Sequence, residues 1–214
     1  MTEHGPLAPV VPLIELAQTA PGMAEAPVCG PPATAAGVAG LANVPRPRGR
    51  DLSGPELQQF VSELADRPEL WIEFVKHDAT QRVYEELLSD EHVTAWLICW
   101  MNDHDTGFHD HDISAGAVAV VSGAVREERL AIDGPPRNSV YQAGASFHFS
   151  PADIHRVRHA GGDPAVTLHV YSPPLLRMGA YEIGDDGVLE RHPMSYLEEL
   201  RPLEETDGVV ERTS

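Results

Sequence analysis

From about residue 93 onward, the hydrophobic and polar positions follow a pattern typical of β-structure. Short runs rich in Val, Ile, Thr and aromatic residues alternate with turn residues. They predict strands at 93–100, 116–121, 124–132, 146–149, 154–159, 165–171 and about 178–184. Ser-Gly at 122–123 and Gly-Pro-Pro at 134–136 are typical of hairpin turns. Many short strands without intervening helices favour an antiparallel sandwich or barrel over βαβ units.

Helical spacing precedes the strands. One helix is expected between a capping residue, Asp51 or Ser53, and Pro68. Its apolar face consists of Leu57, Phe60, Val61 and Leu64. The apolar residues of 71–88 indicate one or two further short helices, or a helix and a strand. Residues 196–200 predict a short C-terminal helix.

The first 50 residues differ in composition from the rest. They contain 10 Ala, 9 Pro and 6 Gly and no aromatic residue. Such a segment buries too little apolar surface to offset the entropy lost when it is ordered. We therefore expect a disordered tail over 1–50, one domain over 51–205 and a C-terminal tail over 206–214.

Charge and hydropathy narrow the classes of partner. The 214 residues include 15 Lys+Arg and 33 Asp+Glu, a formal net charge of −18, which repels nucleic acids and anionic membranes. No apolar run approaches the ~18 residues that span a bilayer, and the N-terminus lacks a signal-peptide pattern. We expect a cytoplasmic monomer. The two cysteines, Cys29 and Cys99, are too few for a disulfide framework or a thiolate metal site.

Histidine is unusually frequent in one window. Seven of the 11 histidines lie between His104 and His169. His109 and His111 are two residues apart, so an extended backbone places both rings on one face, where neutral imidazoles are suitable metal ligands. A solvated loop is the alternative for this pair, because four aspartates surround it: Asp103, Asp105, Asp110 and Asp112.

The wider spacing resembles the two motifs of the cupin superfamily. In the first motif an H-x-H pair precedes a metal-binding glutamate and a turn glycine; here Gly116 and Gly123 hold those two positions. In the second, a histidine follows a turn glycine by eleven residues, as His155 follows Gly144. The resemblance implies an all-β double-stranded β-helix (jelly roll) with short N-terminal helices. It also implies a metal site formed by His109, His111 and His155.

A site of three neutral histidines leaves the charge of a divalent ion uncompensated. It therefore favours anionic ligands, such as a thiolate, a diketone, a carboxylate or hydroxide. The choice among these ligands comes from a family resemblance carried by two segments, His155-Arg156-Val157 and the L-H-V-Y-S-P-P string at 168–174. Over about residues 70–180 the sequence resembles the cysteine dioxygenase type I family of thiol dioxygenases. The resemblance implies Fe(II) on the three histidines, with a small thiol and O2 as substrates.

The same resemblance implies roles for further residues. Tyr171 corresponds to a tyrosine that hydrogen-bonds the substrate carboxylate or the bound oxygen, and His169 to the histidine that orients it. Thr167 stands in place of a serine of that relay. Arg82 is the candidate for the arginine that binds the substrate carboxylate; a surface arginine on a helix is the alternative. Gly116 stands where mammalian relatives have a cysteine crosslinked to the tyrosine, so we expect no crosslink.

The implied reaction adds both atoms of O2 to the sulfur of a small thiol, with L-cysteine giving cysteine sulfinic acid. One alternative is 3-mercaptopropionate or another small thiol as substrate. A second is a different cupin enzyme, such as an isomerase or a diketone-cleaving oxygenase, and a third is a non-catalytic ligand-binding cupin. Three imidazoles would also bind Ni, Zn or Cu.

The other polar residues near these motifs are expected to be structural. Asp110 and Asp112 flank the ligands, and an extended strand turns them to its opposite face. Cys99 is expected to be a small buried residue. His104 and His148 are expected to be surface or strand residues rather than ligands, and His159 is expected to lie behind the ligands or to be structural.

Overall fold

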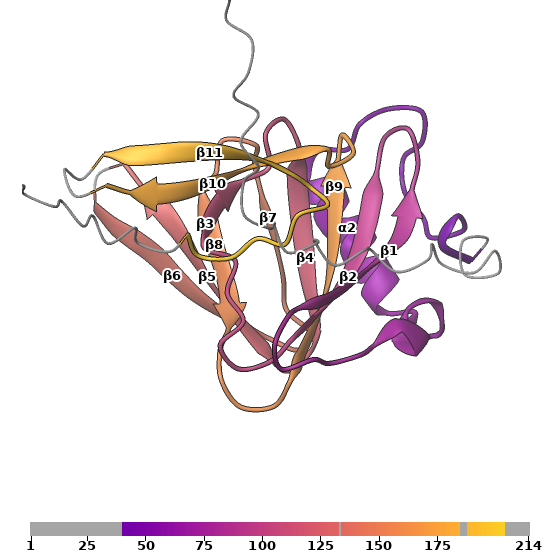
Figure 1. Ribbon diagram of the computed structural model, residues 1–214. Coiled ribbons are helices and arrows are strands. Elements are labelled where there is room, and N and C mark those ends of the chain that lie inside the picture. The colour runs from indigo at the N-terminus through magenta and orange to yellow at the C-terminus, as the bar shows by residue number, and fades with distance from the viewer. Residues whose placement is uncertain (1–39, 133, 185–187, 204–214) are drawn as a thin grey trace, which may run out of the picture.

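The computed structural model describes residues 40–132, 134–184 and 188–203 (Figure 1). Helix α2 (Gly54–Ala65) and two short 3-10 helices, η1 (Pro68–Leu70) and η2 (Ile72–Phe74), precede the strands. The strands are β1 (Val83–Ser89), β2 (Thr94–Trp100), β3 (Phe108–Asp110), β4 (Ala115–Ser122), β5 (Ala124–Ala131), β6 (Gly134–Gln142), β7 (Ser146–Phe149), β8 (His155–His159), β9 (Ala165–Ser172), β10 (Arg177–Ile183) and β11 (Leu189–Ser195).

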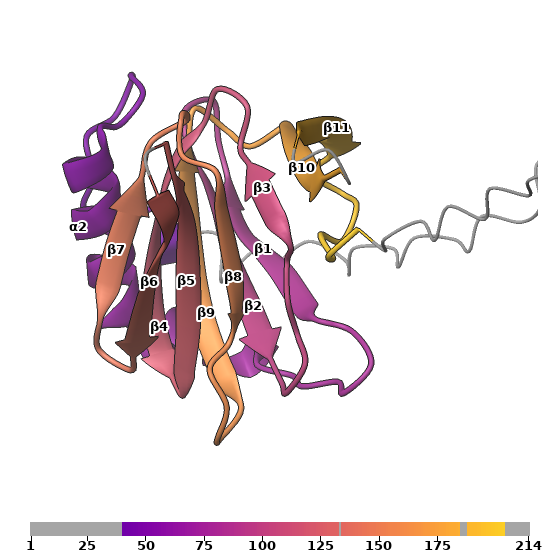
Figure 2. The same cartoon turned by 90° about the vertical axis from the view of Figure 1, so that its left-hand side faces the viewer.

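The strands form two antiparallel sheets that face each other (Figure 2). Their orders are β1-β2-β9-β4-β7 and β11-β10-β3-β8-β5-β6. Strands distant in sequence are neighbours in space, as where β9 lies between β2 and β4. This arrangement confirms the predicted all-β double-stranded β-helix. Among the described residues, no helix is both long enough and apolar enough to cross a membrane.

Helix α2 covers the outer face of the first sheet (Figure 2). It begins after Ser53, whose backbone N–H donates a hydrogen bond of 2.9 Å to the Glu56 carboxylate, a contact typical of a capping box. Its buried face is the predicted one, Leu57, Phe60, Val61 and Leu64. The predicted helix is therefore confirmed.

Strand β9 separates the hydrophobic core from the space between the sheets. Every residue of this strand is buried, and successive side chains point to opposite faces. Val166, Leu168 and Val170 pack in the core beneath α2. The alternate residues, Thr167, His169 and Tyr171, therefore face the second sheet. One strand thus contributes to the core on one side and to a polar site on the other.

Several expected elements differ from those observed. Residues 134–136, expected as a turn, begin β6, and two prolines are tolerated there because β6 is an edge strand. The edge strand at the opposite side of this sheet, β11, was also not predicted. Residues 71–88 follow the helix-and-strand alternative, with η2 and β1. The helix expected at 196–200 is wrong, because this segment is not helical.

Core packing begins before the expected domain boundary at residue 51. Leu41 and Val44 are fully buried in the cluster that includes the face of α2. These two residues therefore pack with the domain although they precede that boundary, because their apolar side chains have a partner surface. The rest of the expected N-terminal tail, at 1–39, and the expected C-terminal tail, at 206–214, lie outside the described residues.

Candidate metal centre

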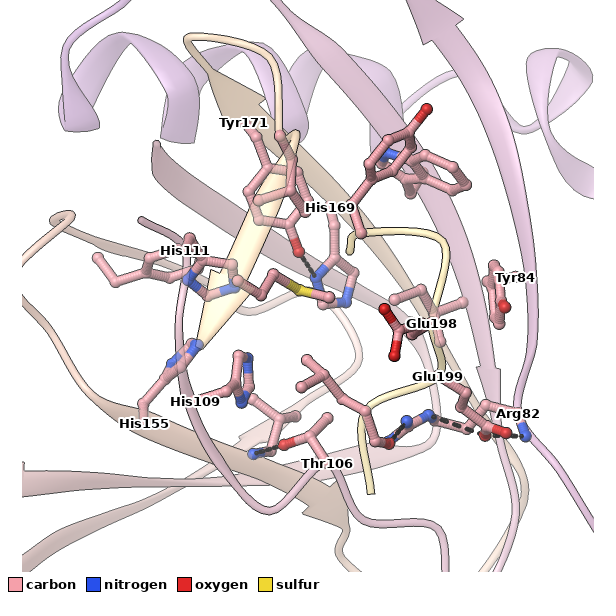
Figure 3. A pocket seen from close by; sticks show the side chains of 18 of the residues that line it. Arg82, Tyr84, Thr106, His109, His111, His155, His169, Tyr171, Glu198 and Glu199 are labelled. Carbon is pink, nitrogen blue, oxygen red and sulfur yellow. Dashed lines mark hydrogen bonds and ion pairs between the residues drawn. The ribbon is translucent and has the colours of Figure 1, made fainter. Parts of the chain in front are cut away.

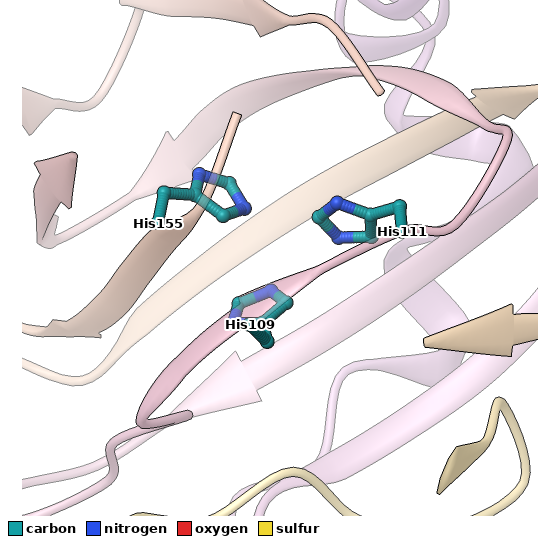
Figure 4. Close-up of side chains that lie close together, drawn as sticks. All are labelled: His109, His111 and His155. Atoms are coloured by element: carbon teal, nitrogen blue, oxygen red, sulfur yellow. The ribbon is translucent and has the colours of Figure 1, made fainter. Parts of the chain in front are cut away.

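The structure brings His109, His111 and His155 together between the two sheets (Figure 4). His109 in β3 and His155 in β8 are register partners on adjacent strands, and His111 follows the end of β3. All three are at most 3% exposed, and their candidate ligand atoms lie within 4.8 Å of one another. This burial excludes the alternative of a solvated loop for the H-x-H pair.

The protonation of these rings fits a metal site. Burial, and next the neighbouring histidines, lowers the pKa of His109 and His111 well below its usual value, so both rings are neutral. Nδ1 of His109 donates a hydrogen bond of 3.1 Å to the Gly107 carbonyl, which leaves Nε2 as an acceptor. Nε2 of His155 is buried and has no hydrogen-bond partner among the described residues. A metal ion would satisfy such a nitrogen.

Glu127 orients one ring of the cluster, and the sequence motifs did not single it out. Its carboxylate oxygen Oε1 accepts hydrogen bonds from His155 Nδ1 at 2.8 Å and from Arg129 Nη2 at 2.6 Å. Burial raises the pKa of Glu127, but these hydrogen bonds outweigh that effect and hold it below its usual value. The charged carboxylate therefore fixes the proton on Nδ1 of His155. Strand alternation was the available signal, since Val125 and Glu127 share the buried face of β5.

Phe149 occupies the space beside the cluster that a carboxylate ligand would need. A Cβ atom on Gly116 would lie 2.2 Å from Cζ of Phe149 and 3.0 Å from Cδ1 of Tyr171. The ring of Phe149 stacks on His111 with centroids 4.5 Å apart. The position of the usual cupin glutamate is therefore closed by an aromatic ring.

A chain of hydrogen bonds crosses from β2 to β9 beside the histidines, and Figure 3 shows its last link, between His169 and Tyr171. Trp100 Nε1 donates to Thr167 Oγ1 at 2.8 Å, and this hydroxyl lies 2.8 Å from His169 Nε2. Nδ1 of His169 is 3.2 Å from the Tyr171 hydroxyl. Burial lowers the pKa of His169 to about 3 and raises the pKa of Tyr171 above its usual value. Both side chains are therefore neutral near pH 7.

Arg82 reaches the same cavity from the residue before β1. It is 6% exposed, and its guanidinium lies over the Trp100 ring at 5.2 Å. Burial lowers the pKa of Arg82 to about 10, with Glu199 opposing the shift, so the group is cationic at neutral pH. This burial excludes the alternative of a surface arginine on a helix.

The histidines, Tyr171 and Arg82 line one cavity of about 90 Å³, shown in Figure 3. The volume restricts an occupant to a small molecule. Neutral nitrogens lie at one end of it and a cationic guanidinium at the other. Such a cavity suits a compact ligand with two anionic groups.

Comparison with known proteins identifies the family. A family model of cysteine dioxygenase type I matches residues 48–183, more than half of the chain. The chain belongs to this family. It is 30% identical to cysteine dioxygenase type 1 of Danio rerio over 132 residues, which are 56% of this chain and 65% of that protein. The chain thus spans slightly less than two thirds of that relative's length.

Other relatives of this family member are more distant. Cysteine dioxygenase type 1 of Bos taurus is 24% identical over 146 residues, 63% of this chain and 72% of that protein. Among solved structures, a protein from Thermus thermophilus is 16% identical and has a TM-score of 0.43, covering 48% of this chain and 93% of that chain. An RmlC-like cupin from Methanocaldococcus jannaschii is 20% identical and has a TM-score of 0.38, covering 46% and 86%.

The C-terminal segment of this cysteine dioxygenase family member forms a wall of the cavity that sequence motifs missed. The segment contributes Tyr196, Glu198, Glu199 and Leu200 to the lining. The sequence predicted only a short helix at 196–200, with no role for the glutamates of this segment. Instead, the backbone N–H of Arg82 donates a hydrogen bond of 3.0 Å to Glu199. Only a long-range contact of this kind shows that the segment lines the cavity.

The flanking aspartates of the cysteine dioxygenase family member point away from the histidine cluster. Asp110 accepts hydrogen bonds from Arg191 and from the Tyr181 hydroxyl, both at 2.6 Å. Asp112 pairs with Arg177 at 3.1 Å. Both aspartates stabilise the contact between β3 and its neighbours rather than the cluster.

The remaining residues of the histidine window have structural partners. His104 is buried in the loop after β2, where Nδ1 accepts a hydrogen bond from the Met101 backbone N–H at 3.0 Å. The expectation that it lies on the surface or in a strand is therefore wrong. His148 is exposed in β7, and His159 ends β8 against the Asp163 carbonyl. Cys99 is a buried free cysteine, as expected.

Proposed function

We propose that this protein is an iron-dependent thiol dioxygenase that converts L-cysteine and O2 to cysteine sulfinic acid. The observation that carries the proposal is the single small cavity shared by three buried histidines, a buried tyrosine and a buried arginine. Membership of the cysteine dioxygenase type I family supports the same reaction.

The three histidines fit a divalent metal. His109, His111 and His155 would hold Fe(II), which when bound would supply the redox chemistry between O2 and a thiolate. Because Gly116 and Phe149 leave no space for a carboxylate, the ligand set carries no charge of its own. An anionic thiolate is therefore favoured over a neutral thiol at this end of the cavity.

Arg82 and Tyr171 would bind the other end of the substrate. The guanidinium is cationic, and its Nη1 is buried without a hydrogen-bond partner among the described residues, so it is available to a carboxylate. The Tyr171 hydroxyl keeps its proton because its pKa is raised by burial. His169 positions that hydroxyl, and Thr167 positions His169. Holding the substrate at both ends restricts its motion before reaction.

We also propose that Tyr171 is unmodified. Gly116, the residue whose ideal Cβ would lie beside the ring, has no sulfur. The described cysteine, Cys99, packs in the core beneath α2 on the other face of the first sheet. A thioether between Cys99 and the tyrosine would require a side chain to cross that sheet.

Oxygen uptake tests the proposed reaction. Protein loaded anaerobically with Fe(II) is mixed with O2 and either L-cysteine or 3-mercaptopropionate, and the product is identified by mass spectrometry. Uptake with cysteine sulfinic acid as product is the expected result. Uptake with 3-mercaptopropionate alone would keep the chemistry and change the substrate. No uptake with either thiol, by protein shown to hold iron, would contradict the proposal.

A further inference from the structure

The segment that follows β11 packs firmly against the cavity. The Leu200 side chain is 9% exposed and lies in the cluster between the sheets. The Tyr196 ring meets the Trp96 ring edge-on, with centroids 6.1 Å apart. These contacts fix the backbone on either side of Glu199, which is therefore held next to Arg82.

Glu199 presents a nearly buried carboxylate to the end of the cavity that Arg82 occupies (Figure 3). Its side chain is 8% exposed. Oε1 accepts a hydrogen bond from the Arg82 backbone N–H, and Oε2 accepts one of 2.6 Å from Arg201. The Arg201 side chain is 60% exposed, so solvent weakens its compensation of the Glu199 charge.

The side chain of Glu199 affects the guanidinium of Arg82 through charge rather than through a hydrogen bond. Its Oε1 lies 3.6 Å from Nε of Arg82, which is beyond hydrogen-bond distance. The guanidinium is oriented by other groups, since Nη2 donates to the Leu200 carbonyl and the group lies over the Trp100 ring. Nη1 has no partner among the described residues and is the donor left for a ligand.

We propose that Glu199 is a specificity-determining residue, whose charge lowers the affinity of the cavity for thiols that carry a carboxylate relative to thiols that carry none. A substrate carboxylate on Arg82 would share one guanidinium with Glu199. Two carboxylates that share a partly buried site repel each other, and the repulsion is stronger there than in water. The inference rests on the proposed function, because that function assigns Arg82 to substrate binding.

The variant Glu199→Gln tests the inference. It keeps the side-chain length and an acceptor for the Arg82 N–H, and it removes the charge. Dissociation constants of 3-mercaptopropionate and of 2-mercaptoethanol are measured by calorimetry on anaerobic Fe(II)-loaded protein, so that no turnover is needed. We expect 3-mercaptopropionate to bind about 3- to 10-fold more tightly, the scale of one partly screened charge. The neutral thiol should change less than about twofold by the same reasoning.

A matched control removes one charge elsewhere. Glu190 is exposed in β11, and Glu190→Gln should leave both affinities unchanged. If Glu199→Gln proves unstable, Glu199→Ala also removes the charge and should show the same selective gain. Weaker binding of 3-mercaptopropionate would overturn the inference, since it would show that Glu199 positions Arg82 for the ligand. An equal change for both thiols would also overturn it, since it would show that Glu199 only maintains the structure of the cavity wall.

The test also separates this inference from the proposed reaction. A wild-type protein that binds 3-mercaptopropionate but forms no sulfinate from any thiol would contradict the reaction and leave the affinity comparison valid. Normal sulfinate formation with no selective gain in Glu199→Gln would contradict the role of Glu199 alone. KM values under O2 should follow the dissociation constants.

Discussion

Glu127 and His155 are joined by a hydrogen bond of 2.8 Å between side chains of the adjacent strands β5 and β8. The bond determines which nitrogen of His155 faces His109 and His111. A carboxylate behind a ligating histidine also raises the basicity of the ring. The cluster of three histidines therefore has one negative charge directly behind it.

Replacing Glu127 should weaken metal binding without removing a ligand. Glu127→Gln removes the charge that holds the proton on His155 Nδ1, so we expect the affinity for Fe(II) to fall about 10- to 100-fold. Anaerobic competition with a chelator measures it. The matched control is Glu128→Gln, because Glu128 lies on the opposite face of β5 and pairs with Arg158 at 2.6 Å. Equal affinities in the two variants would contradict the role of Glu127.

Removing one ligand should abolish both iron binding and activity. His155→Ala leaves two imidazoles, which are too few to retain Fe(II) in a site without a carboxylate. Metal analysis and thiol-dependent O2 uptake measure the two losses. His148→Ala is the control, because His148 is exposed in β7. Iron-dependent turnover that persisted in His155→Ala would show that this histidine is not a ligand.

The contribution of Thr167 to stability and to kcat should come from its hydroxyl group alone. Thr167→Val keeps the shape but leaves Trp100 Nε1 and His169 Nε2 buried without their shared partner. We expect a loss of about 1–3 kcal/mol in the free energy of unfolding and a lower kcat with iron content unchanged. Urea denaturation and steady-state kinetics measure these effects. Thr167→Ser should restore both, and failure of that rescue would rule out the hydroxyl as the cause.

Gly116 should tolerate no side chain. Gly116→Ala places a Cβ 2.2 Å from Phe149 Cζ, and the ring is confined by its stacking on His111. We expect a destabilisation of about 1–3 kcal/mol, as for an overpacked core, measured by urea denaturation. Gly134→Ala has no atom within 4 Å of the new Cβ and should be nearly neutral. Similar values for the two variants would contradict the tight contact.

Acid should destabilise the metal-free protein because its buried histidines resist protonation. The pKa of His169 is lowered to about 3, and those of His109 and His111 are also lowered, whereas an unfolded histidine has a pKa of about 6.5. Below that pH the unfolded chain binds protons that the folded protein excludes. The free energy of unfolding should therefore fall on acidification, by at most ~1.4 kcal/mol per pH unit for each histidine.

Urea titrations of metal-free protein between pH 7.5 and pH 4.5 measure this dependence. The variant His169→Gln removes one of the three groups, so its stability should fall less steeply over the same range. Above pH 7 the contribution of these histidines should be flat. A slope that is unchanged in His169→Gln would show that His169 is not among the groups responsible.

Strand spacing predicted one part of the site, and the family resemblance implied the rest. His109 and His111 lie two residues apart, which places both rings on one face of an extended segment. Thr167, His169 and Tyr171, which the resemblance implied, have the same spacing on β9. Both sets therefore reach the space between the sheets. The buried face of α2 could also be predicted from the sequence, because its apolar residues recur at the helical period.

The parts that the sequence did not predict depend on long-range packing. β6 and β11 are edge strands with mostly exposed side chains, so neither shows the alternation that marks a half-buried strand. Strand alternation places Glu127 and its neighbour Glu128 on opposite faces of β5, but only the position of His155 on β8 shows which of the two contacts the histidine cluster. Glu199 reaches Arg82 across 117 positions of the chain, a contact that no local pattern encodes.

The contact between Gly116 and Phe149 has a consequence for the evolution of the site. A glutamate or cysteine introduced at 116 by one substitution would destabilise the fold, since its Cβ would overlap the ring at 149. Relatives with either residue at 116 are therefore expected to have a smaller or displaced side chain at 149. The two positions should therefore vary together among relatives. The residue at 149 would then distinguish proteins that have a charged or crosslinking side chain at 116 from proteins that have none.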